Sequence, residues 1–168
     1  SHMDVISLST EPDSYDFVLH INAVQVEGSF EDGEPYGFQI VDINKWDNYK
    51  EVAVHTSGSS SDDVYVLYWY DGSDIILMDR LSRWPTFLGN GIVYVDNARG
   101  FWTQRDKYIL DNKLRKLELV PQDVYYVGVK VQVSKSFPIY KTRQLRGQVA
   151  LLGENTEIEL IMCDLNDS

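Results

Sequence analysis

The chain has 168 residues, a single cysteine and a formal net charge of -11. Apolar side chains make up 43% of it, which is enough for a packed core and excludes a disordered chain. One cysteine excludes an internal disulfide and a cysteine-rich zinc site, and no apolar run approaches the roughly 20 residues needed to span a bilayer.

The negative charge is concentrated in one half of the sequence. Residues 1–84 hold 16 acidic and 4 basic side chains, a net charge of -12, whereas residues 85–168 hold 10 and 11, a net charge of +1. An acidic surface repels nucleic acid and anionic membranes, and it favours a basic protein, a cation or solubility alone. We therefore expect a protein or peptide partner and no nucleic acid.

The first elements are short strands. Residues 1–3 resemble the remnant of a cleaved affinity tag, so the fold begins near Asp4. Apolar and polar residues alternate over 15–21, and the phase slips after Ala23, which predicts a bulge or a strand end. An acidic loop follows over 28–35.

The next elements lead to the centre of the chain. Alternation at Tyr36, Phe38 and Ile40 predicts a strand, Asp42 to Lys50 could form a helical turn, and Glu51 to Thr56 reads as a short strand. The segment 57–63 has the composition of a mobile loop.

The stretch from Val64 to Met78 organises the prediction. Two apolar runs meet across Asp71-Gly72-Ser73-Asp74, which is a hairpin signal with Tyr70 and Ile75 flanking the turn. Both faces of the first run are apolar, which predicts an inner strand covered on both sides.

The second half continues as short antiparallel strands. Trp84-Pro85 interrupts the pattern before Ile92 to Val95, and further strands are expected at 101–103, 108–110 and 114–120. This spacing is typical of a meander or a propeller blade, although no repeat is evident. The predicted fold class is therefore all-β, with antiparallel meander or sandwich-like sheets.

The last third begins with a long strand, since Tyr125, Val127, Val129, Val131 and Val133 are apolar at period two. Pro138-Ile139-Tyr140-Lys141-Thr142, then Gly147-Gln148-Val149-Ala150 and Gly153-Glu154-Asn155-Thr156-Glu157-Ile158-Glu159-Leu160, follow. Residues 128–164 resemble the first strands of bacterial SH3-like domains. The family's later Trp-bearing strand and closing Gly-Trp segment are missing.

That resemblance implies a small SH3-like barrel portion and non-catalytic binding of peptides or cell-wall components, with no ligand residue to carry over. We expect an antiparallel β domain over 4–123 and SH3-like strands over 124–168, which could belong to the same domain. It also implies a bacterial protein that is periplasmic, secreted or at the cell surface, from which a leader has been removed.

The sequence offers no signature of catalysis. His20 and His55 lie in strand-like contexts without zinc spacing, and Cys163 has no spaced histidine partner. The acidic residues of the Asp71–Asp74 turn and Asp79 could supply oxygen ligands, but their spacing does not match a calcium-binding loop. The preference of Asp-Gly pairs for turns explains this stretch without a metal. We expect no catalytic residue, no metal and no cofactor.

Aromatic residues are the better lead, because four Trp and eleven Tyr exceed the needs of a core of this size. The predicted binding residues combine the acidic loop with neighbouring aromatic side chains: Glu31, Asp32, Glu34, Tyr36 and Trp46.

The resulting hypothesis is a non-enzymatic binding module that recognises a protein, a peptide or a cell-wall component. Two alternatives stay open. One is an acidic immunity or inhibitor protein that neutralises a basic toxin or hydrolase by electrostatic steering. The other is a glycan hydrolase that uses a pair of carboxylates.

Overall fold

The computed structural model describes residues 3–56, 63–83 and 85–165. Every regular element in these residues is a β-strand, and all the strand pairings are antiparallel, which confirms the predicted fold class. The chain divides into two compact units. Unit 1 runs to Ala98 and includes Arg105–Pro121; unit 2 comprises Arg99–Gln104 and the chain from Gln122 onward.

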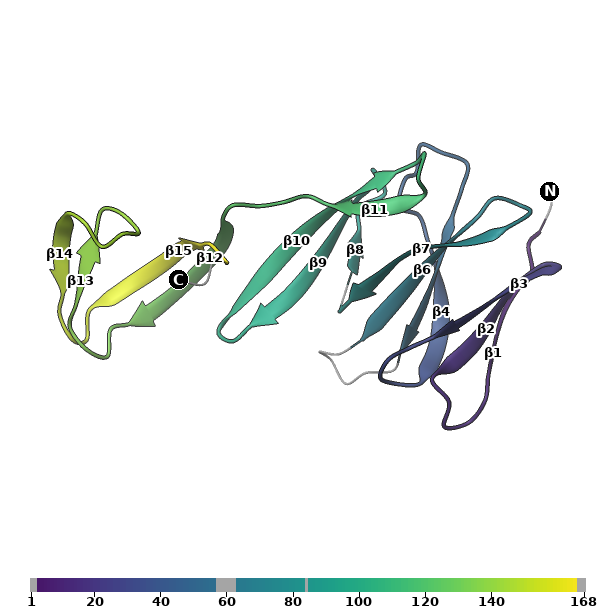
Figure 1. Cartoon of the computed structure of the whole chain (residues 1–168), viewed down its shortest axis with the longest axis horizontal. Coiled ribbons are helices and arrows are strands. Elements are labelled where there is room, and N and C mark those ends of the chain that lie inside the picture. The colour runs from purple at the N-terminus through teal and green to yellow at the C-terminus, as the bar shows by residue number, and fades with distance from the viewer. Residues whose placement is uncertain (1–2, 57–62, 84, 166–168) are drawn as a thin grey trace. The chain divides into compact units, whose positions relative to one another are not determined.

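Three sheets build unit 1, and each is a meander of consecutive strands (Figure 1). Sheet A contains β1 (Ile6–Thr10), β2 (Asp16–Ile21) and β3 (Val24–Ser29). Sheet B contains β4 (Pro35–Val41), β5 (Glu51–Thr56), β6 (Val64–Tyr70) and β7 (Ile75–Ser82). Sheet D contains β8 (Pro85–Phe87), β9 (Ile92–Arg99), β10 (Trp102–Asp111) and β11 (Lys116–Leu119), and residues 99–104 at the β9–β10 turn are the part of it that belongs to unit 2.

The predicted central hairpin is confirmed. Strands β6 and β7 pair, with Tyr70 directly opposite Ile75 at the turn. Strand β6 lies inside sheet B between β5 and β7, and its five middle residues, Tyr65 to Trp69, are all buried. A strand with apolar side chains on both faces needs cover on both sides, and sheet B has it.

Two apolar cores cover the two faces of sheet B. On one face, Val66 and Tyr68 of β6 pack with Phe17 and Leu19 of sheet A. On the other, Leu67 and Trp69 pack with side chains of sheet D, which are Val93, Val95, Leu110 and Leu117. Sheet B is therefore the middle layer of unit 1, and its ends are where loops from several strands meet.

One local prediction takes a different form in the structure, and another is confirmed as one of its two alternatives. Asp42 to Lys50 contains turns and bends but no helix. Hydrogen bonds tie this loop to the start of sheet D, from Lys45 N to the Gly89 carbonyl (3.0 Å) and from Gly91 N to the Ile43 carbonyl (2.7 Å). These bonds favour an irregular path over a helical turn. The phase slip at Ala23 is a strand end, because Ile21 pairs with Val24 across a two-residue turn.

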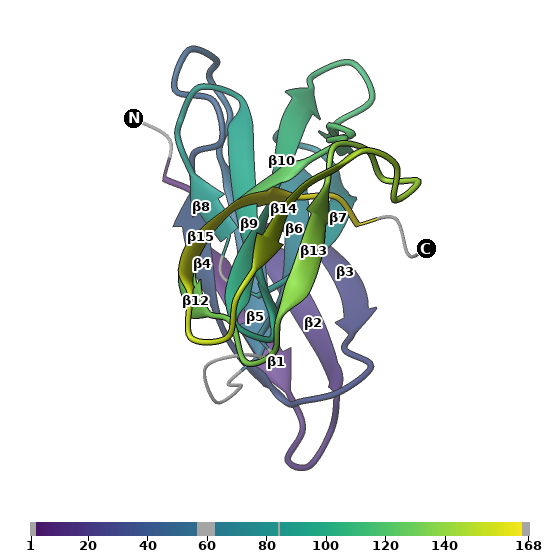
Figure 2. The same cartoon turned by 90° about the vertical axis from the view of Figure 1, so that its left-hand side faces the viewer.

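Unit 2 contains two two-stranded sheets. One pairs β12 (Tyr125–Gln132) with β15 (Glu157–Cys163), and the other pairs β13 (Phe137–Tyr140) with β14 (Gln148–Leu152) (Figure 2). A bulge at Gly128, whose φ is +62°, shifts the register of β12. Among the described apolar residues of this unit, Val133 alone is fully buried, at 4% exposure.

No described segment is a helix of the length and hydropathy that crossing a bilayer requires. The segment 57–63 falls outside the described residues except for Asp63, as does Trp84 of the expected strand break.

Candidate functional site

The acidic loop between β3 and β4 is anchored to its neighbours by a buried ring, a backbone hydrogen bond and a close glycine contact. Phe30 is buried, its ring lies 5.3 Å from the Phe17 ring, and its N–H donates to the Tyr15 carbonyl (2.9 Å). Gly33, at a φ of +88°, lies so close to Thr56 that an added Cβ would come within 3.3 Å of that side chain. The loop is therefore held against the end of β5.

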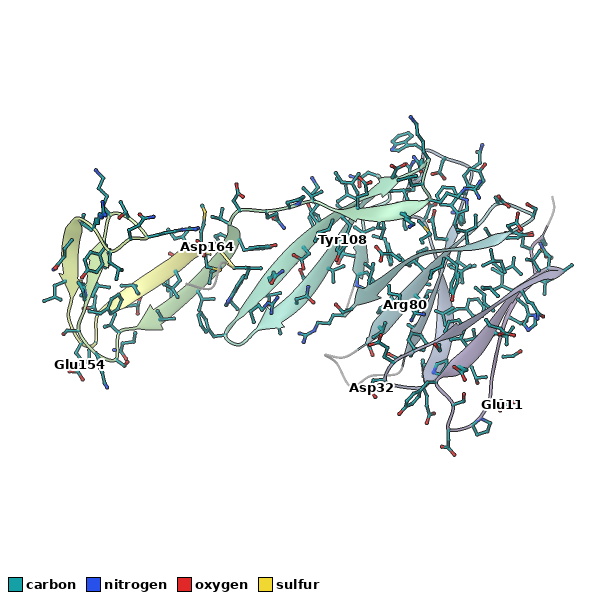
Figure 3. All side chains as sticks on the ribbon, viewed as in Figure 1. Glu11, Asp32, Arg80, Tyr108, Glu154 and Asp164 are labelled. Atoms are coloured by element: carbon teal, nitrogen blue, oxygen red, sulfur yellow. The ribbon has the colours of Figure 1, made fainter. Side chains whose placement is uncertain are left out.

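The carboxylates of this loop face solvent. Glu31, Asp32 and Glu34 are all exposed on the anchored loop, and Figure 3 labels Asp32 in this connection between β3 and β4. Arg80 of β7 reaches this end as well, because its guanidinium donates to the Ser29 carbonyl (2.7 Å). The loop presents three negative charges on a fixed backbone.

A row of aromatic rings crosses sheet B beside this loop. Tyr36 of β4 lies over His55 of β5 (ring centroids 5.8 Å), and His55 stacks on Tyr65 of β6 (5.4 Å, interplanar angle 25°). We call Tyr36, His55 and Tyr65 the aromatic ladder. Its burial is graded, since Tyr65 is buried, His55 is half-buried and Tyr36 is 74% exposed.

A β-bulge places Tyr36 in the ladder. The pairing of β4 with β5 shifts between Pro35 and Gly37, so Tyr36 is the extra residue. Bulges redirect a side chain and bend an edge strand, and here the redirected side chain lies over His55. The exposed ring at the end of the ladder therefore sits next to the acidic loop on the chain and in space.

A further carboxyl group, that of Asp63, affects the pKa of Tyr65 at the buried end of the aromatic ladder. Asp63 is 6% exposed, and its Oδ1 has no hydrogen-bond partner among the described residues. Burial raises the pKa of the Tyr65 hydroxyl, the charge of Asp63 raises it further, and a hydrogen bond with Gln39 opposes the rise. Tyr65 thus stays neutral at ordinary pH.

Trp46 does not join the other predicted binding residues. It is 88% exposed on the loop that follows β4, whereas Tyr36 stands near the beginning of that strand. Seven extended residues cover about 23 Å, so the two rings lie at opposite ends of sheet B. The structure brings Glu31, Asp32, Glu34 and Tyr36 together and separates Trp46 from them.

The end of sheet B near Trp46 has its own aromatic and charged cluster. Trp69 lies 4.9 Å from the Tyr49 ring, and the Arg115 guanidinium stands 5.8 Å from its ring centroid. Arg115 also pairs with Asp71 (2.8 Å), and backbone N–H donors from Asp74 and then Ser73 hold the pKa of Asp71 well below its usual range. With its oxygens engaged in this way, Asp71 acts as a turn residue.

Three carboxyl groups each retain one buried oxygen without a hydrogen-bond partner among the described residues: Asp42 and Asp47 on the loop before β5, and Glu51 at the first position of β5. Glu51 is 1% exposed, and its other oxygen accepts from Ile43 N (2.9 Å). Burial raises the pKa of Glu51, against the effect of that hydrogen bond, and the neighbouring carboxylates raise it further. No three acidic, histidine or cysteine side chains of the described ranges are positioned to hold a metal ion.

A hollow of about 640 Å³ lies on sheet A, and three carboxylates are among its lining residues: Glu11, Asp16 and Glu27. A carboxylate hydrolase needs one carboxyl with a raised pKa as its general acid. The carboxyls that burial shifts upward, Glu51 and Asp79, belong to sheet B and do not line this hollow.

The remaining candidates have ordinary structural surroundings. His20 is half-buried on β2, and Cys163 is a free, half-buried thiol at the end of β15. His55 proved more informative than its strand context suggested, because it joins Tyr36 to Tyr65. Antiparallel pairing of neighbouring strands could have indicated this row in the sequence, but the bulge at Tyr36 hides the register.

Comparison with known proteins gives no match. No protein-family model fits the chain, and neither a curated protein nor a solved structure is significantly similar to it. The functional argument therefore rests on the geometry of the site.

Proposed function

We propose that this protein is a non-enzymatic binding module that recognises a basic segment of a protein partner at the acidic loop and the aromatic ladder. One observation carries the proposal: the exposed ring of Tyr36 lies over His55 beside three exposed carboxylates on an anchored loop. Exposed tyrosine is enriched in binding surfaces, and its ring face attracts lysine and arginine.

The chemistry of the site suits a cation with an alkyl stem. A lysine or arginine side chain can place its methylene groups on the Tyr36 ring while its charge meets Glu31, Asp32 or Glu34. Because the ladder and the loop are both held by buried neighbours, little ordering is needed on binding. The site is thus preorganised for a basic peptide or protein loop.

The charge distribution supports one narrower role within this class. A net charge of -12 over residues 1–84 would accelerate encounter with a strongly basic partner, as an immunity or inhibitor protein for a basic toxin or hydrolase requires. A bacterial envelope or secreted setting, which the SH3-like resemblance of residues 128–164 implies, would bring the chain into contact with such partners. Recognition of a cell-wall component belongs to the same proposal of non-catalytic binding.

The test is an NMR titration of the whole chain with a short lysine- and arginine-containing peptide. Amide shifts should concentrate on residues 31–36 and His55, and Tyr36→Ala should weaken binding about tenfold, as expected for loss of an interface anchor. Trp46→Ala is the matched control, because that exposed ring lies at the other end of sheet B, and it should leave affinity unchanged. Shifts spread evenly over the acidic half, or equal losses in the two variants, would contradict the proposal.

A further inference from the structure

The second half of the chain contains a long segment without negative charge. Residues 124–153 hold five basic side chains and no acidic one, a net charge of +5, whereas residues 1–84 carry a net charge of -12. The five basic residues are Lys130, Lys135, Lys141, Arg143 and Arg146. Residues 124–153 belong to unit 2 and residues 1–84 to unit 1, so the chain is bipolar.

Three of these five cations lie on one loop, residues 141–147, which joins β13 to β14 and can be followed in Figure 2. We call it the basic loop. Two backbone hydrogen bonds close it, from Lys141 N to the Gly147 carbonyl (3.0 Å) and from Leu145 N to the Thr142 carbonyl (3.1 Å). Every residue of the loop is exposed. The basic loop therefore presents its side chains to solvent on a hydrogen-bonded backbone.

The charges of the basic loop are not equally available to a partner. Arg143 pairs with Asp164 of the same unit, so its charge is engaged. Lys141 and Arg146 have no ion-pair partner among the described residues. Leu145, next to Arg146, is 68% exposed, and its φ of +56° is uncommon for a leucine. The loop thus offers two unpaired positive charges and one exposed apolar side chain.

The acidic loop and Tyr36 of unit 1 have the complementary composition. The three carboxylates of the acidic loop have no ion-pair partner among the described residues, and the exposed ring of Tyr36 lies beside them. Lysine and arginine pair with carboxylates, and their methylene stems, like a leucine, pack on an aromatic ring. Lys141 and Arg146 match the carboxylates, and Leu145 matches Tyr36.

We propose that the basic loop of one copy of the chain docks, head to tail, on the acidic loop and Tyr36 of a second copy. The inference rests on the proposed function, because it identifies a second copy as a carrier of the basic segment that the site recognises. The two surfaces differ, so a docked copy leaves one of each kind free, and association continues to rings or open chains. A more strongly basic partner competes with the loop for the same site.

Ionic strength determines where this contact is observed. At 0.01 M salt the Debye length is about 30 Å, so the net charge of -11 makes whole copies repel each other. At 0.15 M it is about 8 Å, and charges in direct contact dominate. Exposed ion pairs are individually weak, so the contact requires high protein concentration. In sedimentation of the whole chain at 0.15 M salt, the average mass should rise with concentration beyond that of a dimer.

Two double variants reverse the two sides of the contact. K141E/R146E changes the basic loop and E31K/E34K changes the acidic loop. Each should weaken association at least about tenfold, because like charges then face each other. For E31K/E34K this loss is expected even though the net negative charge of the chain falls. K130E/K135E is the matched control for K141E/R146E, because it makes an equal charge change at exposed residues of unit 2 outside the basic loop, and it should weaken association far less.

A mixture of the two double variants provides the decisive readout. The intact basic loop of E31K/E34K meets the intact acidic loop of K141E/R146E, so the mixture should form complexes that neither variant forms alone, and both chains must be folded to do so. A wild-type chain that stays monomeric, equal losses in K141E/R146E and K130E/K135E, or a mixture that stays monomeric would overturn the proposal.

Failure of the proposed function gives a different result. In that case the basic peptide of the NMR titration produces no concentrated shifts at residues 31–36. If the present inference alone is wrong, the peptide still binds there while the wild-type chain sediments as a monomer at every concentration.

Discussion

Trp69 and Trp46 provide a matched pair for testing the layered core. Trp69 is 3% exposed between sheets B and D, whereas Trp46 is 88% exposed. A buried aromatic side chain removes about 150–250 Å² from water, worth about 4–6 kcal/mol at 25 cal/mol per Å², and truncation to alanine costs about 3–5 kcal/mol. The indole N–H of Trp69 has no partner among the described residues, so its removal recovers part of that cost. We expect Trp69→Ala to cost about 3 kcal/mol.

Urea unfolding of the whole chain, followed by circular dichroism, measures this cost from the shift in midpoint at constant slope. Trp69→Phe should cost about 1 kcal/mol or less, because it keeps an aromatic ring against Tyr49 and removes the unpartnered N–H. Trp46→Ala should stay within about 0.5 kcal/mol of the wild type. A cost below about 1 kcal/mol for Trp69→Ala, or equal costs for both tryptophans, would refute the account of the core.

Three further predictions concern single side chains. The folded pKa of Glu51 is raised, so the protonated carboxyl stabilises the fold fully below the ordinary pKa of 4.5, and this stabilisation is lost as the pH rises through the raised pKa. Glu51→Gln lacks this titration, so in thermal unfolding its melting temperature should rise relative to that of the wild type with increasing pH. Asp71 has a lowered pKa, so its contribution is present above 3.8 and is lost as the pH falls; Asp71→Asn should lower the neutral-pH melting temperature and flatten the acid limb, and an unchanged acid limb would contradict this. Gly28→Ala should cost about 1–3 kcal/mol in urea unfolding, since the new Cβ would meet the Phe17 ring at 2.4 Å; a neutral result would show that the ring can move away freely.

Hydrophobic periodicity predicted which faces of the strands of unit 1 are buried, because successive side chains of a strand point to opposite faces of the sheet. In β6 both phases are apolar, and the strand is covered on both faces. In β2 the apolar residues Phe17, Leu19 and Ile21 share one phase, and the face of sheet A that carries them is the buried one. Local patterns of period two therefore carry the number of covered faces as well as the strand itself.

The loop over Asp42 to Lys50 was harder to predict. Trp46 and Tyr49 have helical spacing, yet the segment is irregular because its backbone groups bond to Gly89 and Gly91, which lie about 45 residues further along the chain. A local pattern cannot register partners so distant in sequence. The burial of the Glu51 carboxyl was also hard to predict, since the position of Glu51 opposite Trp69 follows from the pairing of β5 with β6.

The candidate site was predicted in part for a similar reason. Glu31, Asp32, Glu34 and Tyr36 are neighbours in sequence, so one anchored loop and the first residues of β4 keep them together. Trp46 was grouped with them by composition, but a whole strand separates it. His55 and Tyr65 were missed because the ladder is assembled across three strands, through a bulge that shifts the pattern by one residue.

The most direct test of the central claim is the association rate of a basic protein partner, captured from the native host by the whole chain, as a function of ionic strength. The Debye length falls from about 30 Å at 0.01 M to about 8 Å at 0.15 M salt, so the rate should fall steeply over that range. The triple variant E31K/D32K/E34K should bind much more slowly at low salt. A control of equal charge change on exposed carboxylates elsewhere in unit 1, D4K/D74K/E118K, should slow binding far less. A rate indifferent to salt, or equal slowing by the two triple variants, would contradict the claim that the acidic loop and the aromatic ladder form the binding site.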